Sequence, residues 1–362
     1  MSKTYSSASL KVFAHAVLRG FGCDENEADI VADHLVEANL AGHDSHGIGV
    51  LPMYGDRVAA GHLKPSQTPV LNDPIGAISV VDARQGFGHR MALLAIDHAM
   101  KTLPQHKVAV LAMRNSGHVS RLGTYSEYCA ARGCVSLHMV NVTGHPPLVA
   151  PFGARRPGFS TNPISIAMPG HGEREGQPHP MLDMATSTIA FGKVRVADNE
   201  GKQVPPGTLV DEEGVETRDP APMARERIGA LQAFGGHKGS GLGVFIELLT
   251  GALAGNGTVA SAEDRPHMVI NTLFSIILAP SAFDDPAHIA ERTETYYDYV
   301  RALDPAKGVA QVLMPGDPEN ISRAERHASG IPVDDETIRQ IIATGAAFGV
   351  EEHELKALLQ TV

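Results

Sequence analysis

The sequence predicts an α/β protein with helical ends. Helical patterns open and close the chain, while its middle alternates short apolar runs of strand length with helices and loops. The chain has 362 residues, which exceeds the size at which a single core stops growing, so more than one lobe is expected. We expect a helical region at residues 1–75 and 285–362, and an α/β region at residues 76–284. The latter should include a small hairpin-containing insert at about 195–225.

The N-terminal part is expected to begin with two amphipathic helices. Apolar residues recur at helical spacing over residues 10–18 and again over residues 30–40. Asp24 and Glu27 form a start similar to a capping box for the second helix, and Gly42 ends it.

The middle of the chain predicts alternating strands and helices. A helix is expected at residues 90–106, a continuous apolar run at 108–113 indicates a buried strand, and a second buried strand is expected at 135–141. Residues 114–118 would then be a loop beyond the carboxyl end of a strand, where ligands collect in α/β sheets. Further expected elements are a helix at 124–131, a loop at 144–158, a strand at 164–168, a polar insert at 170–180 and an exposed hairpin within 198–218. An apolar helix should run from 235 to about 255, followed by helices at 287–303, 335–344 and 351–359.

Composition excludes several classes of partner. The formal net charge is -11, and no run of basic residues is longer than Arg155 and Arg156, which argues against nucleic acid. No stretch approaches the roughly 20 apolar residues that span a bilayer, and charged residues interrupt residues 1–20, so neither a membrane partner nor a signal peptide is expected. The three cysteines lack a Cys-x-x-Cys spacing, which argues against a disulfide framework. We therefore expect a cytoplasmic protein.

The strongest candidate for chemistry is the sequence His43, Asp44, Ser45, His46, which follows the second helix. An imidazole has an unperturbed pKa of about 6.5 and can act as a general acid near neutral pH. His46 is the first candidate for this role. In the alternative interpretation, His43 and His46 only bond to carbonyls at the end of the helix.

Two further polar groups follow predicted strands. His118 and Arg121 could relay a proton and bind a carboxylate, because a guanidinium offers two parallel donors to a carboxylate. Asp183, followed by Met184 and Ala185, could orient a histidine. An ordinary polar loop and a helix cap are the respective alternatives.

Two segments could contact a bound cofactor. Thr161, Asn162 and Pro163 precede a predicted strand, although taken alone they favour a simple turn held by Asn and Pro. His237 and Lys238 lie within a glycine cluster that opens a helix but matches no standard nucleotide-binding fingerprint. A lysine near a helix N-terminus is unfavourable unless an anion offsets the repulsion, so an anionic ligand is favoured there.

A metal site is not predicted. The chain contains 18 histidines, but no His-Glu-x-x-His or comparable set of ligands. A histidine-rich metal-dependent hydrolase or binding protein remains a non-redox alternative.

Taken in order, these segments resemble the malate/L-lactate/ureidoglycolate dehydrogenase family, whose NAD(P)-dependent enzymes lack a Rossmann fold. The motifs are GHDSHG at 42–47, RNSGH at 114–118 with Arg121, GFSTNP at 158–163, LDMAT at 182–186, GK at 192–193, DP at 219–220, GGHKG at 235–239 and PG at 315–316. Residues 38–49 and 190–193 look most similar to the bacterial hydroxycarboxylate dehydrogenase B type.

The resemblance implies a homodimer with a three-layer cofactor region that binds NAD or NADP. Carried over by position, His46 is the proton donor to the substrate carbonyl, with His118 as the alternative acid or base and Asp183 beside the cofactor. Ser45 and Arg121 would bind substrate. The residues implied for the cofactor are Thr161, Asn162, Pro163, Asp183, Met184, Ala185, His237, Lys238, Gly316 and Asp317.

One departure bears on the substrate. Many members carry an arginine four residues after the catalytic histidine, whereas this chain has Val50. Arg121 is therefore the candidate anchor for a substrate carboxylate. The expected reaction is hydride transfer between NAD(P)H and a 2-oxo acid to give a 2-hydroxy acid, and reduction of a cyclic imino acid is the alternative.

Overall fold

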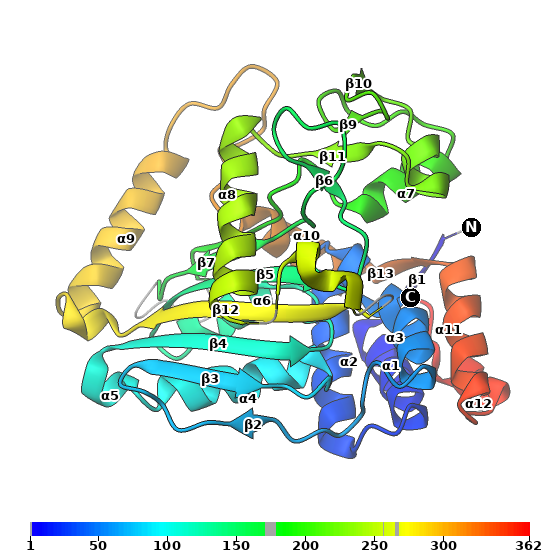
Figure 1. The fold of residues 1–362 in the computed structure, drawn as a ribbon, viewed down its shortest axis with the longest axis horizontal. Helices are drawn as coiled ribbons and strands as arrows, with labels where there is room; N and C mark the ends of the chain where they lie inside the picture. Colours follow the sequence, from blue (N-terminus) through cyan, green and yellow to red (C-terminus); the bar gives the residue numbers. More distant parts are fainter. Residues whose placement is uncertain (1, 171–178, 256, 265–267) are drawn as a thin grey trace.

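A seven-stranded sheet forms the centre of the computed structural model, which describes residues 2–170, 179–255, 257–264 and 268–362 (Figure 1). In spatial order its strands are β2 (Val70–Leu71), β3 (Ile78–Asp82), β4 (Val108–Ser116), β12 (Ile270–Leu278), β5 (Val135–Thr143), β7 (Ile164–Ala167) and β8 (Met181–Met184). Only β3 and β4 are parallel neighbours, and the other pairs are antiparallel. Parallel strands need a crossover connection, and the chain between β3 and β4 forms one that contains a helix.

Helices cover both faces of this sheet. The helices α4 (Gly88–Met100) and α6 (Gly123–Ala130) share a buried core with β12, in which Met91 and Tyr125 join Leu273. On β5, Val140 belongs to this core, whereas the next side chain, Asn141, binds Glu247 of α8 (His237–Glu247). Neighbouring residues of a strand point to opposite faces, so α8 covers the other face. The expected three-layer α/β architecture is confirmed.

The two ends of the chain build a second core together. Residues of α1 (Ser7–Gly20), α2 (Glu25–Leu40) and α3 (Leu51–Ala59) pack with α11 (Asp335–Ala347) and α12 (Glu352–Leu358). The strand β1 (Ser2–Tyr5) pairs antiparallel with β13 (Ile331–Asp334), and Tyr5 also forms a bridge with Thr361, so the two ends of the chain lie close together (Figure 1). Between these parts, α9 (Pro286–Arg301) and α10 (Asp317–Ser329) contain no buried residue. Figure 1 shows α9 at the edge of the molecule.

A small lobe carries the second sheet. Its strands are β6 (Val149–Ala150), β9 (Leu209–Val210), β10 (Glu216–Thr217) and β11 (Ala230–Gln232), with α7 (Phe191–Asn199) packed beside them. The antiparallel pair of β9 and β10 is the hairpin expected within residues 198–218. The apolar helix expected from 235 is α8, continued by the π-helical turn η4 (Leu248–Leu253).

Several sequence-based expectations are wrong. The segment 144–158, expected to be a loop, contains the short strand β6, which pairs with β11. The helix expected at 90–106 is divided into α4 and the short α5 (Leu103–His106). Pro104 has no backbone N–H to bond to the preceding turn, so α4 cannot continue through it. The loop expected at 114–118 is shorter, since β4 continues through Ser116, which pairs with Asn271 of β12. Most of the insert expected at 170–180 lies outside the described residues. Within the described chain, we find no helix with the length and apolarity needed to cross a bilayer.

Candidate active site

A tight turn after α2 presents His46. The turn consists of η1 (Asp44–His46) and η2 (Ile48–Val50), and the side chain of Asn39 spans it. Asn39 donates to Asp44 Oδ1 at 2.7 Å and accepts from the backbone N–H of Ile48 at 2.9 Å. A Cβ at Gly47 would lie only 2.1 Å from Asn39 Oδ1, so a glycine is required for this close approach.

Side chains of the helix α10 bind the same turn. Arg326 donates to both carboxylate oxygens of Asp44, at 2.6 and 2.9 Å, and also to the backbone oxygen of Asn39. His43 Nε2 lies 3.3 Å from Glu319 Oε1 on the same helix. Since bidentate guanidinium–carboxylate pairs fix orientation, α10 helps to set the position of His46.

His46 and His118 form a stacked pair of imidazoles. Their ring centroids are 5.6 Å apart with an angle of 20° between the planes. Ser45 Oγ lies 3.0 Å from His46 Nδ1, and the Ser120 hydroxyl donates to the backbone oxygen of His46 at 2.7 Å. The structure thus brings together Ser45, His46 and His118, as expected for a shared site.

Both imidazoles are neutral at pH 7. Burial lowers the pKa of His46 to about 4, with a further contribution from the charge of His43. Burial also holds the pKa of His118 well below its usual value, and His46 adds to this effect. A neutral imidazole can accept a proton from a hydroxyl, which suits a general base.

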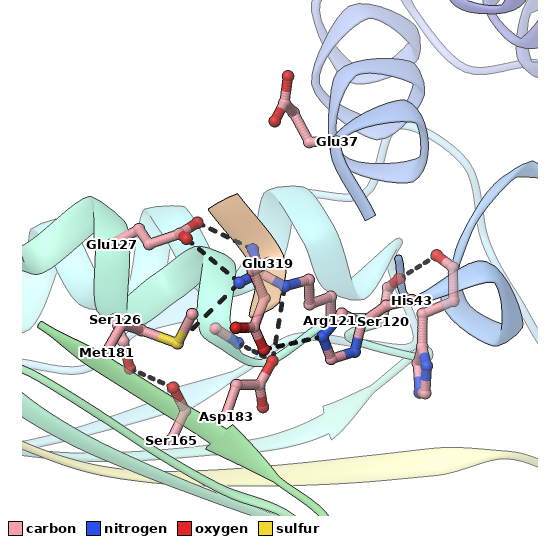
Figure 2. Close-up of polar contacts among 12 residues, drawn as sticks. Glu37, His43, Ser120, Arg121, Ser126, Glu127, Ser165, Met181, Asp183 and Glu319 are labelled. Atoms are coloured by element: carbon pink, nitrogen blue, oxygen red, sulfur yellow. Dashed lines mark hydrogen bonds and ion pairs between the residues drawn. The ribbon is translucent and has the colours of Figure 1, made fainter. Parts of the chain in front are cut away.

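Arg121 is buried and already paired. Its side chain is 0% exposed, and it donates to the two oxygens of Glu127 at 2.8 and 3.2 Å. Its Nε lies 3.6 Å from Asp183 Oδ2. Figure 2 shows the guanidinium between these two carboxylates. A substrate carboxylate would have to lose its hydration and displace Glu127 or Asp183 from the guanidinium, which costs free energy. The role of Arg121 as the anchor for the substrate carboxylate stays a prediction.

Asp183 belongs to this charged cluster. Its Oδ2 accepts from the backbone N–H of Gly123 at 2.8 Å, and its side chain is 7% exposed. Burial raises the pKa of Asp183, while the neighbouring Arg121 opposes the shift. Among the described residues, no hydrogen bond or ion pair joins Asp183 to His46 or His118, so the expected orienting contact is not direct.

The residues expected around the cofactor lie on adjacent segments. Met184 of β8 pairs with Ile164 of β7, which places residues 161–163 and 183–185 side by side. Asn162 is an exception in its side-chain direction. It is fully buried and donates to Glu247 Oε2 at 2.8 Å and to the Gly243 carbonyl at 3.0 Å. The side chain therefore joins this loop to α8, and its expected contact with a dinucleotide is untested.

The remaining candidates for cofactor binding lie at helix starts. His237 and Lys238 are exposed at the first residues of α8, preceded by Gly235 and Gly236 with φ of 57° and 61°. Gly316, with φ of 96°, precedes α10, and a Cβ there would lie 3.4 Å from the Met181 oxygen of β8. The backbone at Gly316 therefore passes close to β8, so Asp317, which follows Gly316, begins α10 near the strand that carries Asp183.

Two residues near the histidine pair escaped the sequence analysis. The Tyr54 hydroxyl lies 2.8 Å from His118 Nδ1 and 3.4 Å from His89 Nε2. Both contacts join segments that are far apart in the chain, and neither residue belongs to a recognisable motif. Within the described residues, no group of three or more His, Cys, Asp or Glu side chains could hold a metal ion.

Comparison with known proteins identifies the family. A model described as malate/L-lactate dehydrogenase matches residues 5–342. The chain belongs to the malate/L-lactate dehydrogenase family. Hydroxycarboxylate dehydrogenase B from Escherichia coli (strain K12) is 39% identical over 358 residues, covering 98% of this chain and 97% of the relative. The family, the fold class and the enzyme class, a hydroxy-acid dehydrogenase, are thereby confirmed.

Two further similarities frame the substrate question. A solved structure of a candidate malate/lactate dehydrogenase from E. coli superposes with a TM-score of 0.91 at 38% identity, covering 98% of both chains. A Delta(1)-pyrroline-2-carboxylate/Delta(1)-piperideine-2-carboxylate reductase from Pseudomonas syringae pv. tomato is 35% identical over 316 residues, covering 86% of this chain and 88% of the relative. Enzymes that act on hydroxy acids and on cyclic imines thus share this scaffold.

Proposed function

We propose that the protein catalyses reversible hydride transfer between a 2-hydroxy acid and NAD or NADP, with His46 as the acid–base residue. The observation that carries this proposal is the stacked pair of His46 and His118 next to the Ser45 hydroxyl. Imidazoles suit a proton that leaves or reaches the substrate oxygen at neutral pH. The nicotinamide, when bound, supplies or accepts the hydride at C2.

The protonation state of His46 determines whether it accepts or donates a proton in the reaction. Because the pKa is lowered to about 4, the ring is neutral and can accept the hydroxyl proton of a 2-hydroxy acid. In the reverse direction the ring must first gain a proton. A substrate carboxylate close to the ring would favour this, since a nearby negative charge raises the pKa of an imidazole.

The start of α8 fits a dinucleotide phosphate. Lys238 is exposed, and among the described residues no carboxylate pairs with it. The positive φ of Gly235 and Gly236 leaves backbone without side chains in front of the helix N-terminus. A lysine at this end of a helix and an adjacent glycine turn favour an anion. Lys238 and His237 would hold the pyrophosphate, while the loop of Thr161 and Pro163 would lie along the cofactor.

We also propose a homodimer in the cytoplasm. Large apolar side chains on α8 and η4 are exposed in the single chain, including Phe245 at 64% and Leu253 at 68%. Such exposure on one helix is typical of a surface that a partner covers. Size-exclusion chromatography with light scattering would show a monomer if this proposal is wrong.

A substrate panel tests the reaction. Oxidation of NADH and NADPH should be followed with pyruvate, oxaloacetate, phenylpyruvate and 2-oxoglutarate, and with Δ1-piperideine-2-carboxylate as the imine. We expect turnover of at least one 2-oxo acid, whereas turnover of the imine alone would favour the reductase alternative. Calorimetry that detects binding of neither dinucleotide would refute the proposal.

A further inference from the structure

A buried line of aromatic side chains extends behind the acid–base pair. In space, the side chain of His118 is followed by that of Tyr54, and then by those of His89 and His34. The hydroxyl of Tyr54 lies between the first two imidazoles, and the rings of His89 and His34 are 4.8 Å apart. Tyr54 is 1% exposed, and His89 is fully buried. The proposed reaction makes no use of Tyr54 or His89.

The described surroundings of His89 decide where its proton lies. His89 Nδ1 is buried and has no hydrogen-bond partner among the described residues, while Nε2 faces the Tyr54 hydroxyl. Burial keeps the pKa of His89 well below its usual value, so the ring carries one proton. A proton on Nδ1 would leave a buried N–H unsatisfied, and orphaned buried N–H groups are the rarer and costlier case. The proton therefore belongs on Nε2, which donates to the Tyr54 oxygen.

The tautomer of His118 follows from that of His89. The phenol of Tyr54 has a single proton that needs an acceptor, and His89 Nε2 cannot accept it because that nitrogen carries a proton of its own. The hydroxyl of Tyr54 must then donate to His118 Nδ1, at 2.8 Å. Since His118 is also neutral, its proton lies on Nε2. Among the described residues, the other titratable groups that interact electrostatically with Tyr54 or His118 include His46, Arg57, His34 and Tyr125, and the first two lower the pKa of His118.

We propose that Tyr54 is a positioning residue that, with His89, holds His118 in the tautomer protonated at Nε2. This proposal deepens the function proposed above and rests on it for its catalytic meaning. A ring with this tautomer is a hydrogen-bond donor through Nε2 and cannot accept a proton there, while the lone pair of Nδ1 is engaged by the Tyr54 hydroxyl. His118 would then donate to the substrate oxygen, and His46 would be the base.

Nitrogen NMR of the imidazoles tests the tautomer without any turnover. The protein labelled at histidine nitrogens should show His118 neutral, with its proton on Nε2, and the resonance is assigned by its loss in His118→Gln. A proton on Nδ1 of His118 in the wild-type protein would overturn the proposal. The proposed reaction could still be correct in that case, because the NMR experiment does not depend on substrate or cofactor.

The variant Tyr54→Phe removes only the hydroxyl and keeps the ring packed against Phe87. We expect His118 to become a mixture of tautomers and kcat/KM to fall about 10- to 100-fold, less than the loss of a general acid or base itself. The matched control is Tyr125→Phe, since that buried hydroxyl donates only to the backbone oxygen of Val119 at 2.6 Å. The control should keep the tautomer even if its melting temperature falls.

Replacement of His89 provides the second variant if Tyr54→Phe does not fold. His89→Gln retains an amide donor at the place of Nε2 and should keep the tautomer of His118 and most of kcat/KM. His89→Leu removes the donor and should lose both. Equal kcat/KM and an unchanged tautomer in His89→Leu would contradict the proposal.

Discussion

The imidazoles of His46 and His118 lie stacked, with their ring centroids 5.6 Å apart. His46 comes from the turn after α2, and His118 from the short loop after β4, so the pair joins the helical end of the chain to the central sheet. Two rings this close cannot both carry a charge without repulsion, and protonation of one lowers the pKa of the other. The site therefore handles a single proton at a time.

Substitution of each histidine should separate their roles. His46→Gln removes the acid–base group, so we expect kcat for 2-oxo acid reduction to fall about 10²- to 10⁴-fold. His118→Gln keeps an amide that can donate, and its loss should be smaller. Steady-state kinetics checks both, with the exposed His327→Gln as a control that should match wild type. A His46→Gln enzyme with nearly normal turnover would remove His46 from the reaction.

Lys238 should determine the affinity for the dinucleotide. A hydrogen bond to a charged group contributes about 1.5–3 kcal/mol, so Lys238→Ala should weaken NAD(P) binding roughly 10- to 100-fold. The effect of salt on the dissociation constant should also diminish. Calorimetry measures both, with Lys202→Ala as the control, because Lys202 is exposed and pairs with Glu200. An unchanged dissociation constant in Lys238→Ala would place the phosphate elsewhere.

Substitution of Arg121 tests whether this buried guanidinium contacts the substrate. If it anchors the substrate carboxylate, Arg121→Lys should raise KM for 2-oxo acids about tenfold or more. If it mainly neutralises Glu127 and Asp183, the melting temperature and kcat should fall while KM changes little. Kinetics together with thermal unfolding distinguishes the two outcomes. Arg323→Lys is the matched control, because Arg323 binds the same Glu127 and is partly exposed. We expect the second outcome from the geometry described above.

Local patterns predicted much of the fold. The strand β4 opens with a continuous apolar run, β5 is rich in apolar residues, and α1 and α2 show clear helical spacing, so these patterns were sufficient to find them. The helix α10 was missed because Ile321 is its one large apolar residue, which leaves no helical period of apolar residues, although Asp317, Pro318 and Glu319 form a typical helix start. Its contacts with Asp44 and His43 depend on ion pairs, which leave no periodic signal.

The candidate site was only partly predictable. The chemistry of His46 and His118 follows from residue type and motif, and the resemblance implied that either of them could act as the acid or base. The pairing of Arg121 with Glu127 and the contact of Tyr54 with His118 are tertiary contacts. No spacing along the chain specifies them, because they depend on how α3, α4 and α6 pack around the end of β4.

The contribution of α10 to holding the turn formed by η1 and η2 can be measured directly. A double-mutant cycle with Asp44→Ala and Arg326→Ala should give a coupling free energy of about 1 kcal/mol or more, because the pair is bidentate and Arg326 is mostly buried. The exposed pair of Glu336 and Arg339 on α11 is the control and should give a clearly smaller coupling, because solvent screens exposed charges. Equal coupling in the two cycles would show that α10 does not fix the turn.

The buried histidines should make the fold acid-sensitive above the range in which carboxylates titrate. Burial lowers the pKa of His34 and of His138 to about 3 and that of His46 to about 4, and it holds the pKa values of His89 and His118 well below normal. In the unfolded chain each has a pKa of about 6.5. The unfolded state therefore binds more protons below pH 6.5, and stability present above that pH is lost as the pH falls toward 4.

One buried histidine isolates this effect. His138 is fully buried, with its Nδ1 2.8 Å from Ser275 Oγ, and it lies away from the proposed site. For one proton, the free energy of unfolding should fall by about 1.4 kcal/mol per pH unit between pH 6 and pH 4. In His138→Gln this slope should be smaller by that amount, even if the variant is less stable at every pH. Urea unfolding at several pH values measures the slopes, and the exposed His353→Gln should leave the slope unchanged. Parallel pH profiles for wild type and His138→Gln would mean that His138 is charged in the folded protein, against the effect expected from its burial.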